Sequence, residues 1–406
     1  MIYICIFLLL IYLIYRYDYK HNERGRLFWL VVVTLIFIVL GGLHYRVGFD
    51  SIQYERFYDH LKPLNRISFK DIESSRYAPG FILLASFTKL LDPEPVLLYF
   101  LESSFVCGVV LWFFKKNTSH PFFALLMFFC YIFTIFIFEE IREAIAVGFF
   151  LLAWPAFKSN NWVRWYALSF CALAFHTSAT VMFVVPLILL PGFRQLFIFG
   201  KRTIIICLFM CILAFVIKAK FGEVFRVLAV TQALSDLTSK YDNTVYVNNT
   251  LNILGILAFF IRQILYPLLA LISLNSFKNS YIKNTEFRKL EMLVMASIYV
   301  TILNIGVPIL GRLNNYFFFF SIIIISDWVF TYICLYSKKV RLRFVYWVIL
   351  LLPMFTMQIY SYYWAKVNKA GTNKAYMVYY PYTSYLSKDK NPERMEVLRQ
   401  AKRMVK

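Results

Sequence analysis

Long runs of apolar residues alternate with short charged segments from one end of the chain to the other. Each run holds roughly 15–25 residues, which lets a helix cross the ~30 Å hydrocarbon core of a bilayer. The runs do not alternate with a period of two, as the strands of a membrane barrel do. The pattern predicts an all-α polytopic membrane protein with about 12 transmembrane helices, within a range of roughly 10–14. The predicted spans are residues 1–15, 27–45, 95–114, 121–138, 141–157, 164–177, 178–191, 202–218, 251–274, 290–310, 315–336 and 344–363.

Lysine and arginine concentrate in the short loops between these spans, and they predict the topology because cytoplasmic loops carry an excess of both. With these loops inside, the N-terminus and the long polar segments 46–78 and 219–250 are extracytoplasmic. We interpret residues 1–363 as a single polytopic transmembrane domain and residues 364–406 as a Tyr/Lys-rich C-terminal tail on the outer side. The loops predicted to be cytoplasmic are 16–26, 115–120, 158–164, 192–202, 276–289 and 337–343.

Three segments need a separate interpretation. Residues 79–91 are too short for an ordinary span and are interpreted as a re-entrant or interfacial helix. Residues 164–191 must break near residues 176–178 to form two short spans. The last part of the tail is either a basic amphipathic helix on the lipid headgroups or a disordered, solvated tail.

The composition agrees with a membrane protein. The chain is 60% hydrophobic and 16% charged, whereas a soluble domain is about 45–50% apolar and about 25% charged. The formal net charge of +21 does not favour a nucleic-acid partner, because the cations form short clusters between apolar runs rather than one basic face. Topology signals and attraction to anionic lipid explain them, and an anionic substrate carried on a lipid is compatible with them.

Several sequence motifs of catalysis are missing from the chain. It contains no P-loop, HExxH or GxSxG motif, and all seven cysteines lie inside apolar runs. Cys207 and Cys211 share a helix face, but no histidine or carboxylate joins them to complete a metal site. We therefore expect chemistry based on arginine, carboxylate and histidine side chains, with no metal and no cofactor.

The predicted topology brings charged residues from four separate regions to the outer membrane boundary. Such convergence is what a site for a charged lipid headgroup requires. Arg142, near the start of a predicted helix, is disfavoured there by the helix dipole, and its planar guanidinium suits phosphate oxygens. The converging residues are Arg46, Asp50, Glu139, Arg142, Glu143, His176 and Arg312.

Some of these residues also have a simpler interpretation. Arg46 can be an interfacial arginine that reaches toward the headgroups. His176 can be a packing histidine bonded to Thr177, Ser178 or the backbone. In the functional interpretation His176 is a base or a phosphate donor, because imidazole titrates near neutral pH.

Three further charges lie deeper in the apolar runs, at Glu102, Arg262 and Asp327. Charges inside a membrane usually face a cavity or one another. We expect Arg262 to pair with Glu102 or Asp327 as a structural ion pair, and a shared cavity would instead favour a transporter.

Five stretches of the chain form a recognisable series: RVGFDSIQY (46–54), YAPGFILL (77–84), IREAIAVGFFLLAWPAF (141–157), ALAFHTSATVMFVVP (172–186) and GRLNNYFFFF (311–320). In order and spacing they resemble the EpsG family of bacterial exopolysaccharide and capsule loci. Two departures from the family pattern are Glu143, where many relatives have Gln, and Ala78, where a Glu commonly precedes the Pro. A carboxylate role at position 78 is therefore excluded.

This resemblance implies a GT-C-like glycosyltransferase fold and a polysaccharide polymerase similar to the Wzy-type O-antigen polymerases. Such an enzyme transfers a growing glycan from polyprenyl (undecaprenyl) diphosphate to the non-reducing end of a new lipid-linked repeat unit. The expected location is the bacterial cytoplasmic (inner) membrane, with the active site on its extracytoplasmic face. The expected partners are polyprenyl-diphosphate-linked oligosaccharide, membrane lipid, and a chain-length regulator and flippase of the same pathway.

Under this hypothesis the candidate residues take separate roles. Asp50 or His176 deprotonates the attacking hydroxyl, and Asp50 ranks first because related lipid-dependent transferases carry their base in the first large outer loop. Arg46, Arg142 and Arg312 bind the diphosphate. The substrate-binding candidates are Tyr54, Glu139, Glu143 and Tyr316, with plain packing as the alternative for the tyrosines. A flippase or transporter of lipid-linked oligosaccharide, a single-addition glycosyltransferase and a ligase remain alternative functions.

Overall fold

The structure is a computed structural model that describes residues 2–219, 266–281, 285–306, 310–334, 375–388 and 391–404. Helices make up most of these ranges, and within them the sole β-type pairing is an isolated bridge between His44 and Ser384. The prediction of an all-helical protein is therefore confirmed for the described part of the chain. The predicted span 344–363 lies outside the described residues.

Contacts divide the chain into two compact units. As far as they are described, the first comprises Met1–Pro186, Ser326–Gln358 and Met377–Arg394, and the second comprises Leu187–Ile325, Ile359–Tyr376 and Met395–Lys406. The single transmembrane domain over residues 1–363 stays a prediction.

Four helical segments among the described residues are long and apolar enough to cross a membrane. Shorter apolar helices add to them at 26–42, 79–91, 177–189 and 268–277. These segments support a polytopic membrane protein, whereas the count of about 12 spans and the GT-C-like fold stay predictions. The four segments are Ile2–Tyr19, Val96–Asn117, Pro121–Phe138 and Gly311–Thr331.

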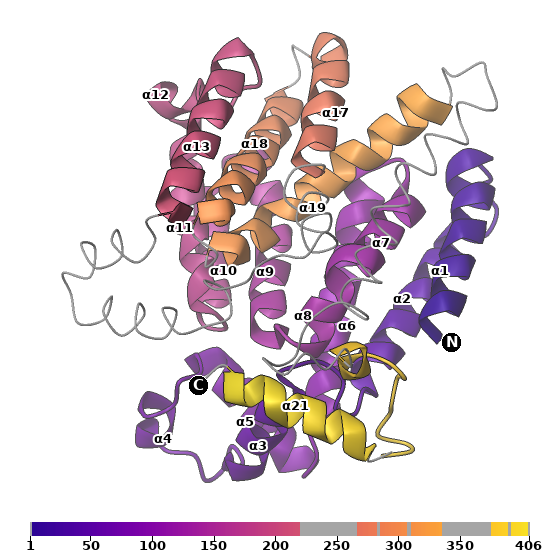
Figure 1. Cartoon of the computed structure of the whole chain (residues 1–406), viewed down its shortest axis with the longest axis vertical. Helices are drawn as coiled ribbons and strands as arrows, with labels where there is room; N and C mark the ends of the chain where they lie inside the picture. The colour runs from indigo at the N-terminus through magenta and orange to yellow at the C-terminus, as the bar shows by residue number, and fades with distance from the viewer. Residues whose placement is uncertain are drawn as a thin grey trace. The chain divides into compact units, whose positions relative to one another are not determined.

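The first unit holds most of the predicted spans at the predicted positions. Figure 1 shows its long helices, among which α2 packs on α6, α6 on α9 and α9 on α10. The predicted break near residues 176–178 is confirmed, because α10 ends at Leu173 and a 3-10 turn begins at Thr177. The long helices are α1 (Ile2–Leu13), α2 (Arg26–Gly42), α6 (Val96–Asn117), α9 (Ile141–Lys158) and α10 (Trp162–Leu173), and α7 (Pro121–Phe128) and α8 (Thr134–Phe138) form one further long segment.

Phenylalanine fills the interior of the first unit. The segment Pro121–Phe138, in which a π-helical turn (Phe129–Phe133) links α7 to α8, is mostly buried. The ring of Phe37 on α2 stacks on that of Phe129 with centroids 5.5 Å apart. A helix that is apolar all round is expected to be buried, and this segment obeys that rule.

The predicted outer segment 46–78 contains two short helices, α3 (Ser51–His60) and α4 (Phe69–Glu73). Tyr54 and Tyr58 of α3, one turn apart, are buried against Phe81 of α5 (Pro79–Leu91). Figure 1 shows α3, α4 and α5 gathered at one end of the long helices of this unit. The short helix predicted at 79–91 is α5, with Pro79 at its first position.

Among the longer described helices of the second unit, α18 packs on both α13 and α17. Within this unit the Tyr299 hydroxyl donates to the Leu196 carbonyl, and Glu291 accepts from the Phe199 amide at 2.8 Å. The helices are α13 (Lys201–Ala219), α17 (Tyr266–Tyr281), α18 (Thr285–Gly306) and α19 (Gly311–Trp328), the last of which continues into the first unit at Ser326.

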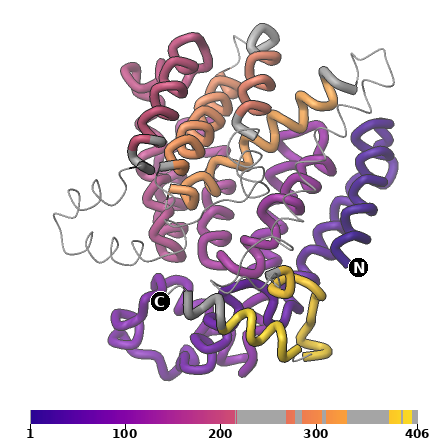
Figure 2. The backbone as a smooth tube through the Cα atoms, viewed as in Figure 1, coloured from indigo at the N-terminus to yellow at the C-terminus, as the bar shows by residue number. Residues whose placement is uncertain are grey.

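Part of the C-terminal tail packs on the first unit. The Tyr45 amide donates to the Thr383 carbonyl at 2.9 Å, and the Tyr385 amide donates to the Leu43 carbonyl at 2.8 Å. Figure 2 traces this backbone segment beside the turn that follows α2. The tail segment around Thr383 is therefore part of the first unit. The last part of the tail forms helix α21 (Pro392–Met404), and its location on the lipid headgroups stays a prediction.

Candidate functional site

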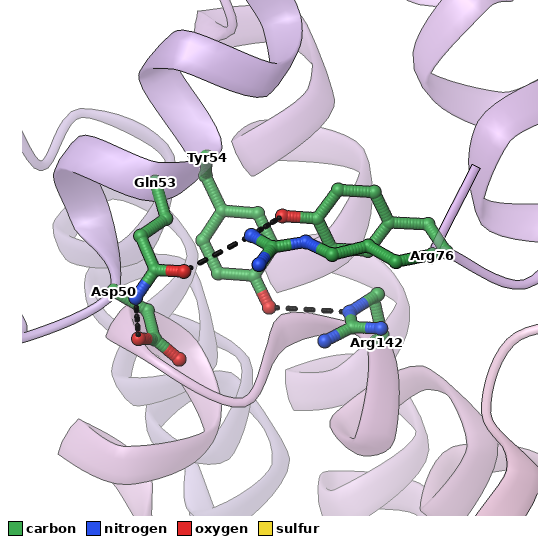
Figure 3. A pocket seen from close by; sticks show the side chains of 6 residues that line it. Asp50, Gln53, Tyr54, Arg76 and Arg142 are labelled. Atoms are coloured by element: carbon green, nitrogen blue, oxygen red, sulfur yellow. Dashed lines mark hydrogen bonds between the residues drawn. The ribbon is translucent and has the colours of Figure 1, made fainter. Parts of the chain in front are cut away.

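A pocket opens where α3, the loop before α5 and the start of α9 meet (Figure 3). Its cavity volume is about 140 Å³. Two arginines, two tyrosines, an aspartate and a glutamine line it, so the wall is polar although the surrounding unit is apolar. The lining residues are Asp50, Gln53, Tyr54, Arg76, Tyr77 and Arg142.

Asp50 stands directly before α3 and reaches the pocket through a tight turn. Gly48 makes this turn possible, because its φ is +95° and a Cβ there would lie 2.5 Å from the Phe138 carbonyl oxygen. The Asp50 carboxylate makes no capping bond to the helix backbone. It instead accepts from the side-chain amide nitrogen (Nε2) of Gln53 at 2.9 Å. The carboxylate is thereby held by a side chain of α3 that also lines the pocket.

Arg76 lies in the loop that precedes α5. Its Nη2 donates to the Gln53 amide oxygen at 3.0 Å and to the Tyr77 hydroxyl at 2.7 Å. Gln53 therefore bridges Asp50 and Arg76, as Figure 3 shows. Both acceptors are neutral, so these bonds fix the position of the Arg76 guanidinium without neutralising its positive charge.

Arg142 is the second residue of α9. Its guanidinium carbon lies 4.5 Å from the centroid of the Tyr77 ring, and its Nε faces the Tyr54 hydroxyl at 3.5 Å. The guanidinium of Arg76 lies 4.8 Å from the same Tyr77 ring. A tyrosine ring attracts a cation through its quadrupole, which allows two like charges to share one small site.

Neither pocket arginine has a carboxylate within salt-bridge distance among the described residues. Burial raises the pKa of the Tyr54 hydroxyl, although the charge of Arg142 opposes this, so Tyr54 stays neutral. Two cations and the single carboxylate of Asp50 leave the pocket with a net positive charge. Such a pocket suits an anionic group with planar or tetrahedral oxygens.

The structure brings three of the predicted site residues together in this pocket, namely Asp50, Tyr54 and Arg142. It places Arg46 in a two-pronged ion pair with Glu55, with N–O distances of 2.9 Å from both Nε and Nη2. Arg46 has a positive φ of +52° and does not line the pocket.

The other predicted residues of the first unit lie outside the pocket lining. Glu139, at the end of α8, accepts from the Phe49 amide at 3.0 Å and from the Tyr379 hydroxyl. Glu143 is buried within α9. His176 Nδ1 bonds to the Ser178 hydroxyl at 2.6 Å, which is the simpler interpretation given for this histidine.

Arg312 and Tyr316 belong to α19 in the second unit. Arg312 is exposed, and Tyr316 is fully buried. Their roles at the site stay predictions.

Sequence reasoning missed Gln53, Arg76 and Tyr77. Gln53 and Tyr77 both stand inside stretches that carry the family resemblance, and Arg76 directly precedes one of them. A signal was therefore present for Arg76 and Tyr77, because a cationic residue and an aromatic residue stand together shortly before the helix that begins at Pro79. The contact between residues 53 and 76 could not be seen in the chain.

The predicted pairing of Arg262 with Glu102 or Asp327 stays a prediction. Arg262 lies outside the described residues. Asp327 accepts from the Thr118 hydroxyl at 2.6 Å, from the Ser119 amide at 3.1 Å and from His120 at 3.1 Å. Glu102 accepts from the neighbouring Ser103 hydroxyl at 3.0 Å.

No group of three or more His, Cys, Asp or Glu side chains is arranged to hold a metal ion in the part of the chain that the structure describes. The independence of the reaction from metals stays a prediction.

The helices and the pocket define a class of protein: an α-helical membrane protein with a positively charged pocket at one end of the long helices of its first unit. The chain belongs to the EpsG family, because the model of that family matches residues 26–384. No curated protein and no solved structure gives a significant match. Membership of the family supports a polymerase-like glycosyltransferase role in polysaccharide biosynthesis, with a lipid-linked oligosaccharide as substrate.

Proposed function

We propose that the protein is a polysaccharide polymerase that uses polyprenyl-diphosphate-linked repeat units at the outer leaflet of the bacterial cytoplasmic membrane. Each cycle transfers the growing glycan from its lipid diphosphate to the non-reducing end of a new lipid-linked unit. The observation that carries this proposal is the pair Arg76 and Arg142, held on one tyrosine ring beside Asp50.

In the proposed step, a sugar hydroxyl of the acceptor attacks the anomeric carbon of the donor. A new glycosidic C–O bond forms, and the C–O bond to the diphosphate breaks. The hydroxyl proton moves to the Asp50 carboxylate, and the polyprenyl diphosphate leaves with the bonding electron pair. The charge that grows on the leaving oxygen is met by Arg76 and Arg142, the type of contact that typically contributes about 10²–10³ in rate.

The size of the pocket limits what it takes. Its volume of about 140 Å³ is below the ~300–1,000 Å³ of a site that encloses a whole ligand. The pocket therefore accepts the charged group at the reacting centre, while the glycan and the lipid extend beyond it. Tyr54 and Tyr77 offer ring faces at this junction.

Two groups of contacts support the outer face as the location of the site. The turn after α2 is hydrogen-bonded to the tail segment around Thr383, so both lie on one side of the membrane. At the other end of α2, Arg26 donates to the Ser119 carbonyl and joins two loops predicted to be cytoplasmic. Because α2 runs from Arg26 to Gly42, the pocket and these loops are at opposite ends of one helix.

Three proposed roles extend beyond the pocket. Arg312 is proposed as a further diphosphate contact, and His176 as the alternative base. Arg46 is proposed to act next to the diphosphate, with its bond to Glu55 fixing its position. The GT-C-like fold is part of the same proposal.

A flippase for the same lipid is the second candidate function, and an anion-binding pocket at one end of the helices would serve it as well. A single-addition glycosyltransferase or a ligase would share the step written above and differ in the product. The glycan that is formed distinguishes the polymerase, the single-addition transferase and the ligase, whereas a flippase forms no new glycosidic bond.

The test is the profile of lipid-linked glycans, with leaflet assignment, in cells that lack the protein. We expect a single complete repeat unit to accumulate in the outer leaflet. A complete unit confined to the inner leaflet would instead establish a flippase, and a truncated unit a single-addition transferase. Complete polymer stranded on the lipid would establish a ligase.

A further inference from the structure

Three segments that are far apart in the sequence meet at one carboxylate oxygen. Oε1 of Glu139, at the end of α8, accepts from the Phe49 amide at 3.0 Å and from the Tyr379 hydroxyl. Phe49 directly precedes Asp50, the proposed base. Tyr379 belongs to the segment 377–385 of the tail, which we name the C-terminal strap.

The strap also holds the turn 43–50 through its backbone. The Gly48 amide donates to the Val378 carbonyl at 3.1 Å, and the Tyr45 amide donates to the Thr383 carbonyl at 2.9 Å. The Thr383 hydroxyl donates to the Tyr45 carbonyl at 2.6 Å. The backbone of this turn is thus paired with the strap over much of its length, although no sheet is formed.

The strap itself is held in shape by one buried side chain. Arg394 donates from Nε to the Met377 carbonyl at 2.6 Å, and from its other nitrogens to the Pro381 carbonyl and the Thr383 hydroxyl. The Tyr382 hydroxyl donates to the Leu40 carbonyl at 2.8 Å and anchors the strap on α2. These bonds make the strap a built part of the first unit.

We propose that the C-terminal strap is a component of the candidate site that positions the turn carrying Arg46 and Asp50, and that Glu139 is the positioning residue that joins strap and turn. Glu139 therefore acts on the reaction through Phe49 and Asp50 and does not bind substrate itself. The part of this inference that concerns catalysis rests on the proposed function, while the part that concerns the turn does not.

The position of both bonds on one oxygen provides a sharp pair of variants. In Glu139→Gln the side-chain carbonyl oxygen can accept both hydrogen bonds, whereas Glu139→Leu removes the acceptor and leaves the buried donors unpaired. Tyr379→Phe removes the strap's hydroxyl alone. Thr383→Val deletes the bond to the Tyr45 carbonyl and the acceptor for Arg394, and it tests the strap without touching Glu139.

The experiment uses the full-length protein in lipid nanodiscs and follows two readouts. Hydrogen exchange reports the amides of Tyr45, Gly48 and Phe49, and a polymerisation assay reports kcat and KM. We expect Glu139→Leu to speed exchange at Gly48 and Phe49 by about tenfold and to lower kcat by about tenfold at nearly constant KM, as expected for the loss of roughly one to two hydrogen bonds. Glu139→Gln should keep both the exchange rates and kcat close to their wild-type values. Tyr379→Phe and Thr383→Val should change both in the same direction as Glu139→Leu, by smaller amounts.

Unchanged exchange in Glu139→Leu, Tyr379→Phe and Thr383→Val would overturn the positioning role. An equal loss in Glu139→Gln and Glu139→Leu would also overturn it, because the carboxylate itself would then be required. If the wild-type protein exchanges as expected but makes no polymer, the proposed function fails and the strap remains. If the wild-type protein makes polymer and the variants show wild-type exchange, the positioning role of the strap fails and the proposed function stands.

Discussion

Two clusters of charged residues in the first unit differ in how their charges are matched. One is the pocket with Arg76, Arg142 and Asp50. The other, which we name the closed cluster, comprises Asp18, Arg26, His120 and Asp327 at the opposite end of α2. In the closed cluster each carboxylate accepts from protein donors, whereas the pocket arginines have neutral acceptors and a tyrosine ring.

The closed cluster joins segments over long distances in the sequence. Asp18 accepts from the Phe123 amide at 2.8 Å and lies 3.7 Å from Arg26, and Asp327 accepts from three donors at 118–120. These bonds join distant segments at this end of α2, although Asp18 Oδ1 and Arg26 Nε have no hydrogen-bond partner among the described residues. Charges that face a cavity without an acidic partner can bind a ligand, and this contrast separates the structural cluster from the candidate site.

The largest effect is expected for the proposed base. Asp50→Asn keeps the shape and the acceptor for Gln53 but removes the proton acceptor, so kcat should fall by roughly 10²–10⁴. KM should change little, because the arginines that bind the anion are intact. A polymerisation assay checks this. A wild-type kcat in Asp50→Asn would show that another residue is the base, and His176→Ala would then be the next variant to measure.

Arg142→Ala should lower kcat/KM for polymerisation by at least about 100-fold, because one of two charges at the leaving group is lost. Arg142→Lys keeps the positive charge but lacks the planar guanidinium, so its kcat/KM should lie between those of the wild type and Arg142→Ala. Thermal unfolding should be little affected, since no ion pair within the described residues is broken. Arg56→Ala is the matched control, an exposed arginine on α3 outside the pocket, and it should retain wild-type activity.

The closed cluster should respond in the opposite way. Asp327→Ala leaves the donors at 118–120 without an acceptor and should destabilise the protein by about 1–3 kcal/mol. Asp327→Asn keeps a carbonyl oxygen and should cost less. Thermal unfolding in detergent measures the loss, and the activity per folded molecule should stay at the wild-type level. A catalytic loss without destabilisation would remove the distinction between the two clusters.

The smallest effect concerns pH. Burial raises the pKa of Glu139 to about 8, and the charges of Asp50 and Glu140 add to the rise. Because this pKa lies above the ~4.3 of an unfolded glutamate, the stabilisation is complete at low pH and is lost as the pH rises toward 8. Exchange at Gly48 and Phe49, corrected for its intrinsic pH dependence, should accelerate modestly between about pH 5 and 9. The same acceleration in Glu139→Gln would assign it to another group.

The sequence predicted the helices better than it predicted their contacts. Apolar runs located α2, α6 and α9 within a few residues, and the short run at 79–91 located α5. Hydrophobic length is a property of one segment, so it can be read along the chain. The helices α3 and α4 within the predicted outer loop were missed because each is short.

Side-chain partners could not be predicted in the same way. Arg46 was expected at a diphosphate, and its partner Glu55 stands only nine residues away in the sequence. The sequence also contained no sign that Asp327 binds the loop at 118–120, which is 207–209 residues away. Such pairs depend on how distant segments meet in space, which the pattern of one chain does not contain. The strap was missed for the same reason.

The most direct test of the central claim is a reconstitution of the purified protein in liposomes with a single lipid-linked repeat unit. We predict that glycan chains longer than one unit form, that one polyprenyl diphosphate is released for each new linkage, and that Arg142→Ala forms both products at least about 100-fold more slowly. Transfer of the unit between leaflets without any new linkage, or polymer formation by Arg142→Ala at the wild-type rate, would contradict the account.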